Sequence, residues 1–171
     1  MSNSTIDTRI QEFKLRFAVP EDTRVILGFI KELAEYESLS CEVVADEEIL
    51  KNSLFERNVA EVIIGEYDER PVGFAVFFHN FSTFLGRPGI YIEDLYIQPE
   101  KRGKGLGKVM LSFLAKLTKE RNCGRLEWSC LDWNLPSINF YKKLGAKPMD
   151  DWTSYRITAK ELDELANYFG K

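Results

Sequence analysis

A cluster of glycines stands between a β-rich run and an amphipathic segment, and this junction constrains the fold more than any other part of the chain. Residues 90–97 (IYIEDLYI) have the composition of a strand, and apolar residues recur at spacings of three and four over 106–117, which predicts a helix. Gly103, Gly105 and Gly107 lie where the intervening loop enters that helix. Free N–H groups at a helix N-terminus bind anions, and glycine lets a phosphate approach the backbone. We therefore predict a strand, a loop and a helix with an anion site at the turn.

The remaining periodicities place this junction in one mixed α/β domain, with a polar tail over residues 1–12 and a single domain over 13–171. The pattern predicts further strands at 13–19, 59–67, 72–78, 125–131 and 152–157, and helices at 22–36, 46–55, 134–144 and from 158 onward. Residues 81–89 are predicted as a loop.

Three local signals are expected to mark helix ends. Asp22 is placed to cap the first helix, and Thr158 with Glu161 forms a capping box before the last one. Gly124 is placed to end the helix that follows the glycine cluster. The last helix is expected to have an apolar face, made of Leu162, Leu165, Ala166 and Phe169.

Composition excludes several classes of protein. The 171 residues, with 44% hydrophobic and 29% charged side chains, are typical of a globular domain and not of a disordered, collagen-like or coiled-coil chain. A net charge of −4 argues against nucleic acid as a partner. No apolar run is long enough to cross a bilayer, and the polar start lacks a signal-peptide hydrophobic region, so we expect a cytoplasmic protein without a membrane partner. Cys41, Cys123 and Cys130 have no metal-ligand spacing.

Two common phosphate-binding motifs fail at the glycine cluster. A P-loop that begins at Gly103 needs a second glycine where Lys108 stands. A dinucleotide fingerprint that begins at Gly103 also needs its third glycine where Lys108 stands. One that begins at Gly105 likewise has no glycine at its third required position.

The pattern that does fit is R-x-x-G-x-G over residues 102–107. It resembles the pyrophosphate loop of the GNAT superfamily of acyl-CoA-dependent N-acetyltransferases. LAEYE (33–37), VGFA (72–75), YIED (91–94) and DWNLPSINFYKKLGA (132–146) are similar to the spermidine/spermine, or diamine, N-acetyltransferase branch, including its thialysine-acetylating relatives. The resemblance implies a GNAT fold, with a central, mostly antiparallel twisted sheet of about six to seven strands flanked by helices, and a homodimer.

The same resemblance implies that acetyl-CoA is the co-substrate and that no metal takes part. The loop and the first turn of its helix would hold the diphosphate, the backbone of the preceding strand would pair with the pantetheine amides, and the DWN segment with its helix would contact the rest of the cofactor. The implied residues are Leu95, Tyr96, Ile97, Arg102, Gly103, Lys104, Gly105, Leu106, Gly107, Lys108, Asn134, Pro136, Ser137, Tyr141 and Lys143.

Glu93 is the candidate base for this chemistry. An alkylammonium with a pKa of about 10.4 loses its proton at pH 7 only at a cost of roughly 4–5 kcal/mol, so a base or an acidic pocket must help. Glu93 stands in an otherwise apolar run, where a carboxylate is costly unless it is used or paired. The resemblance makes it a water-mediated general base and a substrate ligand; the alternative is a solvent-facing residue of an alternating strand. Asp94 is expected to point to the opposite face, so that only one of the two sees the substrate.

Tyr141 is the candidate acid. The sulfur of coenzyme A must leave as a thiolate, and a phenol with a pKa of about 10 is a plausible proton donor to a thiol with a pKa of about 8.5. Tyr141 occupies the general-acid position of the family in NFYKKLGA. The alternative is an ordinary residue of an amphipathic helix.

The acceptor is expected to be a small cationic amine, because carboxylates and aromatic faces bind ammonium groups. The resemblance assigns this role to Tyr36, Glu37, Glu93, Glu127, Trp128, Asp150 and Trp152, and a solvated acidic face is the alternative for Glu127 and Asp150. The loop over 81–89 carries no acid where polyamine-preferring relatives have an aspartate. This difference favours a small diamine or a lysine-like amine, as in the thialysine-acetylating relatives. Acetylation of peptide or protein amines and a non-catalytic acyl-CoA sensor remain as alternative functions.

Overall fold

The computed structural model describes residues 4–170, and their contacts divide the chain into two compact units. The first unit extends to Ser129 and the second begins at Cys130. Each unit is described separately. The single domain predicted over residues 13–171 stays a prediction.

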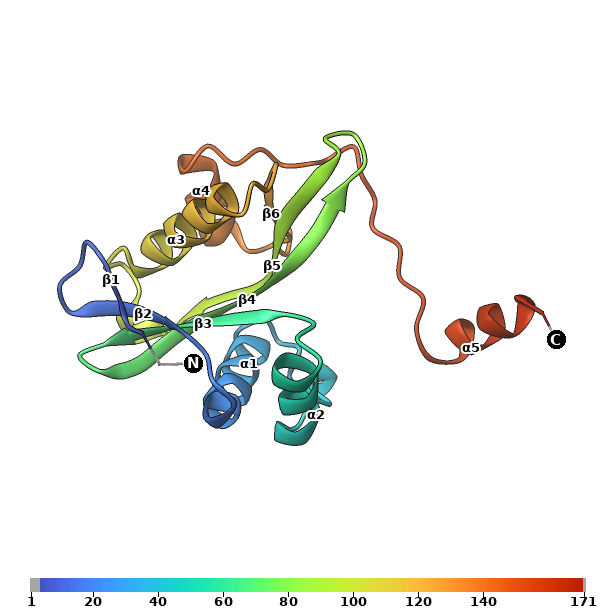
Figure 1. Cartoon of the computed structure of the whole chain (residues 1–171), viewed down its shortest axis with the longest axis horizontal. Helices are drawn as coiled ribbons and strands as arrows, with labels where there is room; N and C mark the ends of the chain where they lie inside the picture. The colour runs from blue at the N-terminus through green and yellow to red at the C-terminus, as the bar shows by residue number, and fades with distance from the viewer. Residues whose placement is uncertain (1–3, 171) are drawn as a thin grey trace. The chain divides into compact units, whose positions relative to one another are not determined.

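Among the described residues, a six-stranded sheet forms the centre of the first unit (Figure 1). All neighbouring strands pair antiparallel except the last two, which are parallel. The mixed α/β fold with a mostly antiparallel sheet is therefore confirmed. The strands lie in chain order: β1 (Ile6–Asp7), β2 (Phe13–Phe17), β3 (Glu61–Tyr67), β4 (Arg70–Ser82), β5 (Arg87–Ile97) and β6 (Leu126–Trp128). β1 lies within the segment predicted as a polar tail.

Helices cover both faces of this sheet (Figure 1). One face is covered by α1 (Thr23–Tyr36) and α2 (Glu47–Lys51), where Phe29 of α1 stacks on Phe74 of β4 with ring centroids 5.5 Å apart. The other face is covered by α3 (Leu106–Glu120), whose Met110 and Leu114 are fully buried. The helix predicted over 46–55 is instead two segments, because a π-helical stretch, Asn52–Glu56, follows α2.

The hairpin between β4 and β5 is longer than predicted. The expected loop over 81–89 is wrong at both ends, because β4 continues to Ser82 and β5 starts at Arg87. The connecting turn is short: Gly86 has a positive φ of 63° and donates its N–H to the carbonyl of Ser82 at 2.8 Å. Cross-strand pairing therefore extends the sheet into a segment whose glycines and proline indicated a loop.

Two of the predicted helix caps have other roles. The carboxylate of Asp22 does not cap α1; it accepts hydrogen bonds from the two terminal nitrogens of the Arg16 guanidinium, at 2.6 and 2.8 Å, and from the N–H of Val19. Burial raises the pKa of Asp22, but these hydrogen bonds outweigh burial and keep the pKa below its ordinary value. Gly124 does not end α3, because Asn122 adopts the left-handed conformation there (φ 53°). A Cβ on Gly124 would lie 2.8 Å from Leu85, so this glycine permits a close packing contact.

The second unit contains two helices, α4 (Leu135–Lys143) and α5 (Ala159–Tyr168). The strand predicted over 152–157 is wrong: these residues form no strand, and Trp152, Tyr155 and Ile157 are exposed. β-rich composition describes how well a residue fits a half-buried sheet, so it does not make a strand without a partner. Thr158 precedes α5 as predicted, but its side chain makes no capping hydrogen bond.

Candidate active site

The glycine loop forms an open cradle at the N-terminus of α3. Gly103 and Gly105 have φ values of 77° and 81°, a conformation that other L-residues rarely adopt. A Cβ built on Gly103, Gly105 or Gly107 meets no atom within 4 Å. No side chain caps α3 and its first turn carries no acidic residue. The first-turn amides of α3 are thus oriented for an anion, and this geometry fits a diphosphate.

Arg102 joins the glycine loop to α1 and β5. Its Nε donates to the carbonyl of Ile97 at 2.9 Å, and its guanidinium lies 4.6 Å from the centre of the Tyr36 ring and 5.5 Å from that of Tyr96. The Tyr96 hydroxyl donates in turn to Glu32 at 3.1 Å; burial, reinforced by this carboxylate, raises the pKa of Tyr96 to about 12. The predicted cofactor ligand Arg102 and the predicted substrate ligand Tyr36 are therefore brought into contact.

Among the other predicted loop residues, only Leu106 is buried, so its side chain anchors α3 in the core and its backbone N–H is the group left for a ligand. Lys108 is exposed in the first turn of α3. Lys104 lies over the ring of Tyr67.

A β-bulge interrupts β5 at Glu93. Asp94 pairs with Val76 and Ile92 with Phe77, which leaves Glu93 without a partner on β4. Directly paired residues share a face, and Val76 and Phe77 lie on opposite faces, so Ile92 and Asp94 do as well. The alternation on which the prediction for Asp94 rested does not hold across this bulge. Asp94 shares its face with Tyr96, on the side of the sheet that α1 covers.

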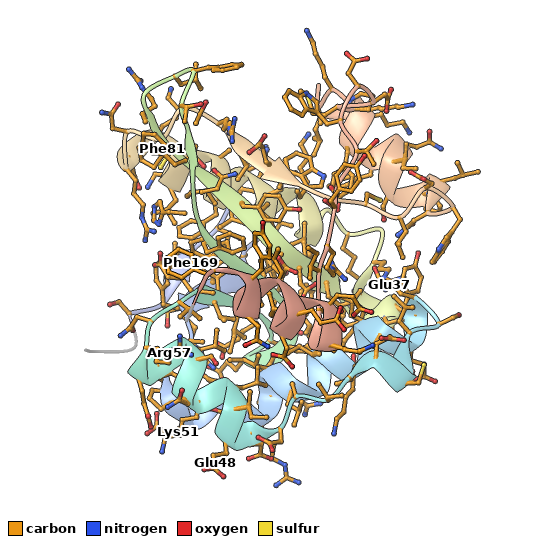
Figure 2. All side chains as sticks on the ribbon, turned by 90° about the vertical axis from the view of Figure 1, so that its right-hand side faces the viewer. Glu37, Glu48, Lys51, Arg57, Phe81 and Phe169 are labelled. Carbon is orange, nitrogen blue, oxygen red and sulfur yellow. The ribbon has the colours of Figure 1, made fainter. Side chains whose placement is uncertain are left out.

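The bulge brings three carboxylates to the end of α1. Burial and, to a lesser extent, the nearby charges of Glu93 and Glu37 raise the pKa of the Asp94 carboxyl to about 6. Burial also raises the pKa of Glu37, which follows the last residue of α1 (Figure 2). Glu93 itself is exposed. The charges of the predicted residues Glu37 and Glu93 therefore both act on Asp94, a carboxylate that the sequence analysis had set apart from the substrate site.

The edge of β5 beside the bulge is free of a neighbouring strand. In the described part of the chain, β6 pairs with β5 only from Ile90 to Ile92, whereas β5 continues to Ile97. The predicted pantetheine-binding residues Leu95, Tyr96 and Ile97 lie beyond the last pair. Pantetheine binding by the backbone of these residues stays a prediction.

Glu127 and Trp128 lie on β6, but the Glu127 carboxylate already has partners. It accepts from the amide of Asn80 at 2.7 Å and forms an ion pair with Arg125, also at 2.7 Å. Substrate binding by this pair of residues stays a prediction, and the ion pair reduces the charge that Glu127 offers to a cation.

The second unit holds the other predicted residues. Asn134 is buried and its side chain accepts from the N–H of Ser137 at 3.3 Å, so it caps α4. Pro136 lies in the first turn, Tyr141 packs beside Phe140 with ring centroids 5.3 Å apart, and Lys143 ends the helix. Asp150 and Trp152 are exposed and lie outside any helix or strand.

Two features are absent from residues 4–170, namely a membrane-spanning helix and a cluster of metal-binding side chains. In this range no helix combines the length and apolar character that a membrane span requires. Nor do these residues contain a group of three or more histidine, cysteine or carboxylate side chains able to hold a metal ion.

Comparisons with known proteins agree with this geometry. The chain is 35% identical to a thialysine N-epsilon-acetyltransferase from Sus scrofa over 164 residues, covering 89% of this chain and 96% of that protein. It is 28% identical to a spermidine/spermine N(1)-acetyltransferase-like protein from Homo sapiens, covering 93% of this chain and 24% of that protein. Among solved structures, an integron cassette protein from V. cholerae matches with a TM-score of 0.77 and 26% identity, over 91% of this chain and 98% of that one.

The family model described as the acetyltransferase (GNAT) family matches residues 17–146, most of the chain. This match spans β3 to β6, the glycine loop and α4, and the relatives come from the branch that the sequence motifs indicated. The chain therefore belongs to the GNAT acetyltransferase family and is an N-acetyltransferase.

Proposed function

We propose that this protein transfers an acetyl group from acetyl-CoA to the primary amine of a small cationic acceptor, most favourably a lysine-like amine. The observation that carries the proposal is the open glycine cradle over residues 103–107, which points uncapped amides of α3 toward a diphosphate-sized anion. The unpaired edge of β5 at Leu95, Tyr96 and Ile97 supplies backbone groups for the pantetheine arm.

The acidic cluster of Glu37, Glu93 and Asp94 supports a cationic acceptor. Burial and the nearby charges of Glu93 and Glu37 raise the pKa of Asp94, and an incoming ammonium relieves this repulsion. The thialysine-acetylating relative supports a lysine-like amine over spermidine. Because the acceptor brings a positive charge to these carboxylates, its binding stabilises the charged form of Asp94.

The reaction divides between two side chains. The co-substrate supplies the acetyl thioester. Glu93, exposed beside the bulge, takes a proton from the ammonium through a water molecule, and the neutral nitrogen attacks the thioester carbon. A C–N bond forms, the C–S bond breaks, and the nitrogen loses its second proton to water. Tyr141 donates its phenolic proton to the leaving thiolate and recovers a proton from solvent.

Acceptor screening tests this function. Purified protein is incubated with acetyl-CoA and thialysine, lysine, ornithine, putrescine, spermidine or a lysine-containing peptide, and free thiol is measured. We expect the highest kcat/KM for the free lysine-like amines. A preference for the peptide would contradict the small-molecule acceptor, and coenzyme A binding without turnover of any amine would identify a non-catalytic acyl-CoA sensor instead.

The protein is also proposed to form a homodimer in the cytoplasm. Apolar side chains of the second unit are exposed, among them Leu165 (56%) on α5 and Phe169 (97%) directly after it, and an apolar surface of this kind is typical of an association site. Light scattering is expected to give twice the chain mass of 19.8 kDa. Leu165→Glu with Phe169→Glu should shift the protein to the monomer, whereas the polar control Asp163→Lys should not. A monomeric unmodified protein would contradict the dimer.

A further inference from the structure

Two lysines of the glycine loop converge on one aromatic ring. The Nζ of Lys101 lies 4.4 Å from the centre of the Tyr67 ring, and the Nζ of Lys104 lies 4.9 Å from the same centre. Tyr67 ends β3, where it pairs with Phe13 on one side and with Arg70 on the other. Tyr67 thus belongs to the central sheet, and the ammonium groups of two side chains from the cofactor loop lie over its ring.

Neither ammonium is neutralised by a carboxylate. The ion pairs within residues 4–170 include those of Lys14, Lys116 and Lys160 with nearby acids, but they do not include Lys101 or Lys104. Asp68 and Glu69 form the adjacent turn, yet neither makes an ion pair with the two lysines in this part of the chain. Two cations that share one ring repel each other, and the ring compensates for this only in part. An anion that contacts both ammonium groups offsets this repulsion.

The position of the two lysines beside the glycine loop indicates which anion they bind. Lys104 stands between Gly103 and Gly105, and Lys101 precedes Gly103 by two residues, so both flank the cradle assigned to the diphosphate. Coenzyme A carries a second anionic group, the 3′-phosphate of its ribose, one nucleoside away from the diphosphate. A phosphate monoester has about −1.5 to −2 charges near pH 7, enough to engage two ammonium groups at once.

We propose that Lys101 and Lys104, positioned by Tyr67, bind the 3′-phosphate of coenzyme A and make the protein prefer coenzyme A over dephospho-coenzyme A. The proposal rests on the proposed use of acetyl-CoA and assigns a separate task to these side chains. The backbone amides of the glycine loop recognise the diphosphate, which both compounds share. The lysines recognise the group that only one of them has.

Calorimetric titration with coenzyme A and dephospho-coenzyme A tests the assignment. The unmodified protein is expected to bind coenzyme A about tenfold more tightly. Lys101→Gln and Lys104→Gln should each weaken coenzyme A about threefold and together remove the preference, with dephospho-coenzyme A unaffected. Lys119→Gln, an exposed lysine on α3, is the matched control and should change neither constant.

Tyr67 is tested with a conservative pair of variants. Tyr67→Phe keeps the ring and should keep the preference for coenzyme A, whereas Tyr67→Leu should reduce it; if Tyr67→Leu does not fold, the two lysine variants decide alone. Equal weakening of both compounds in the double lysine variant would place the lysines on the diphosphate and overturn the proposal, as would no change at all. If the unmodified protein bound neither compound, the proposed function would fail, and this site with it.

Discussion

Replacing Tyr141 with phenylalanine is expected to lower kcat by about 10²–10⁴-fold while the Kd for coenzyme A stays the same. The substitution removes one hydroxyl and keeps the ring that packs beside Phe140 in α4. Without a proton donor the sulfur must leave as a free thiolate, which slows cleavage of the C–S bond but does not affect cofactor binding. Steady-state kinetics and titration calorimetry measure the two quantities separately.

The control for Tyr141 is Tyr168→Phe, which removes the same hydroxyl from an 88% exposed tyrosine of α5 and should leave kcat unchanged. A pH profile adds a second readout, because loss of a general acid removes the alkaline limb of kcat. An unchanged kcat in Tyr141→Phe would exclude the phenol as the acid. A parallel loss of coenzyme A affinity would instead indicate that Tyr141 has a binding role.

Replacing Asp94 with asparagine is expected to change acceptor use and stability in opposite directions. The loss of a carboxylate beside Glu37 and Glu93 should lower kcat/KM for cationic amines by about 10–100-fold, because a hydrogen bond to a charged group contributes roughly 1.5–3 kcal/mol. The same substitution removes a carboxylate whose charged form is unfavourable in the free protein. Asp94→Asn should therefore unfold at a higher urea concentration at pH 7.5.

The pH dependence of the stability gained by Asp94→Asn follows from the raised pKa of Asp94. An Asp94 pKa of about 6, against an ordinary 3.8, means that the folded state holds the proton more tightly than the unfolded state. The free-energy cost of the charged Asp94 carboxylate in the folded protein is absent below pH 4, grows between pH 4 and pH 6, and reaches about 3 kcal/mol above pH 6. The advantage of Asp94→Asn should be largest at pH 7.5 and fall to about half at pH 5.

Urea unfolding of both proteins at the two pH values measures this effect. Glu93→Gln is the matched comparison: its exposed carboxylate should affect turnover and change the free energy of unfolding less than Asp94→Asn does. A stability difference that does not vary with pH would show that Asp94 titrates normally. Unchanged kcat/KM for every cationic amine would remove Asp94 from the acceptor site.

The β5 strand illustrates how far sequence reasoning reached. Its type was correct. The choice of Glu93 as the candidate base stays a prediction, which rests on a carboxylate that stands in an apolar run. The bulge also left a trace that went unused: Ile90 and Ile92 alternate, but the next apolar residue of that face, Leu95, comes three positions later instead of two. This change of phase moves Asp94 to the face covered by α1.

The segment over 152–157 illustrates the opposite error. Its aromatic and β-branched residues are typical of a strand, yet a strand forms only where a neighbouring edge accepts its hydrogen bonds. No strand forms there in the described chain. The prediction that Asp22 caps a helix was wrong for a related reason: its carboxylate binds Arg16 and not the helix that follows it.

Local sequence alone determined the strand, glycine loop and helix that form the cofactor cradle, because backbone conformation at Gly103 and Gly105 and the free amides of a helix start depend on neighbouring residues. The tertiary structure alone decided which charges meet. Glu37 at the end of α1 acts on Asp94 of β5, and Lys101 and Lys104 of the glycine loop lie over Tyr67 of β3. Electrostatic interaction depends on distance in the folded chain, and separation along the sequence does not reveal that distance.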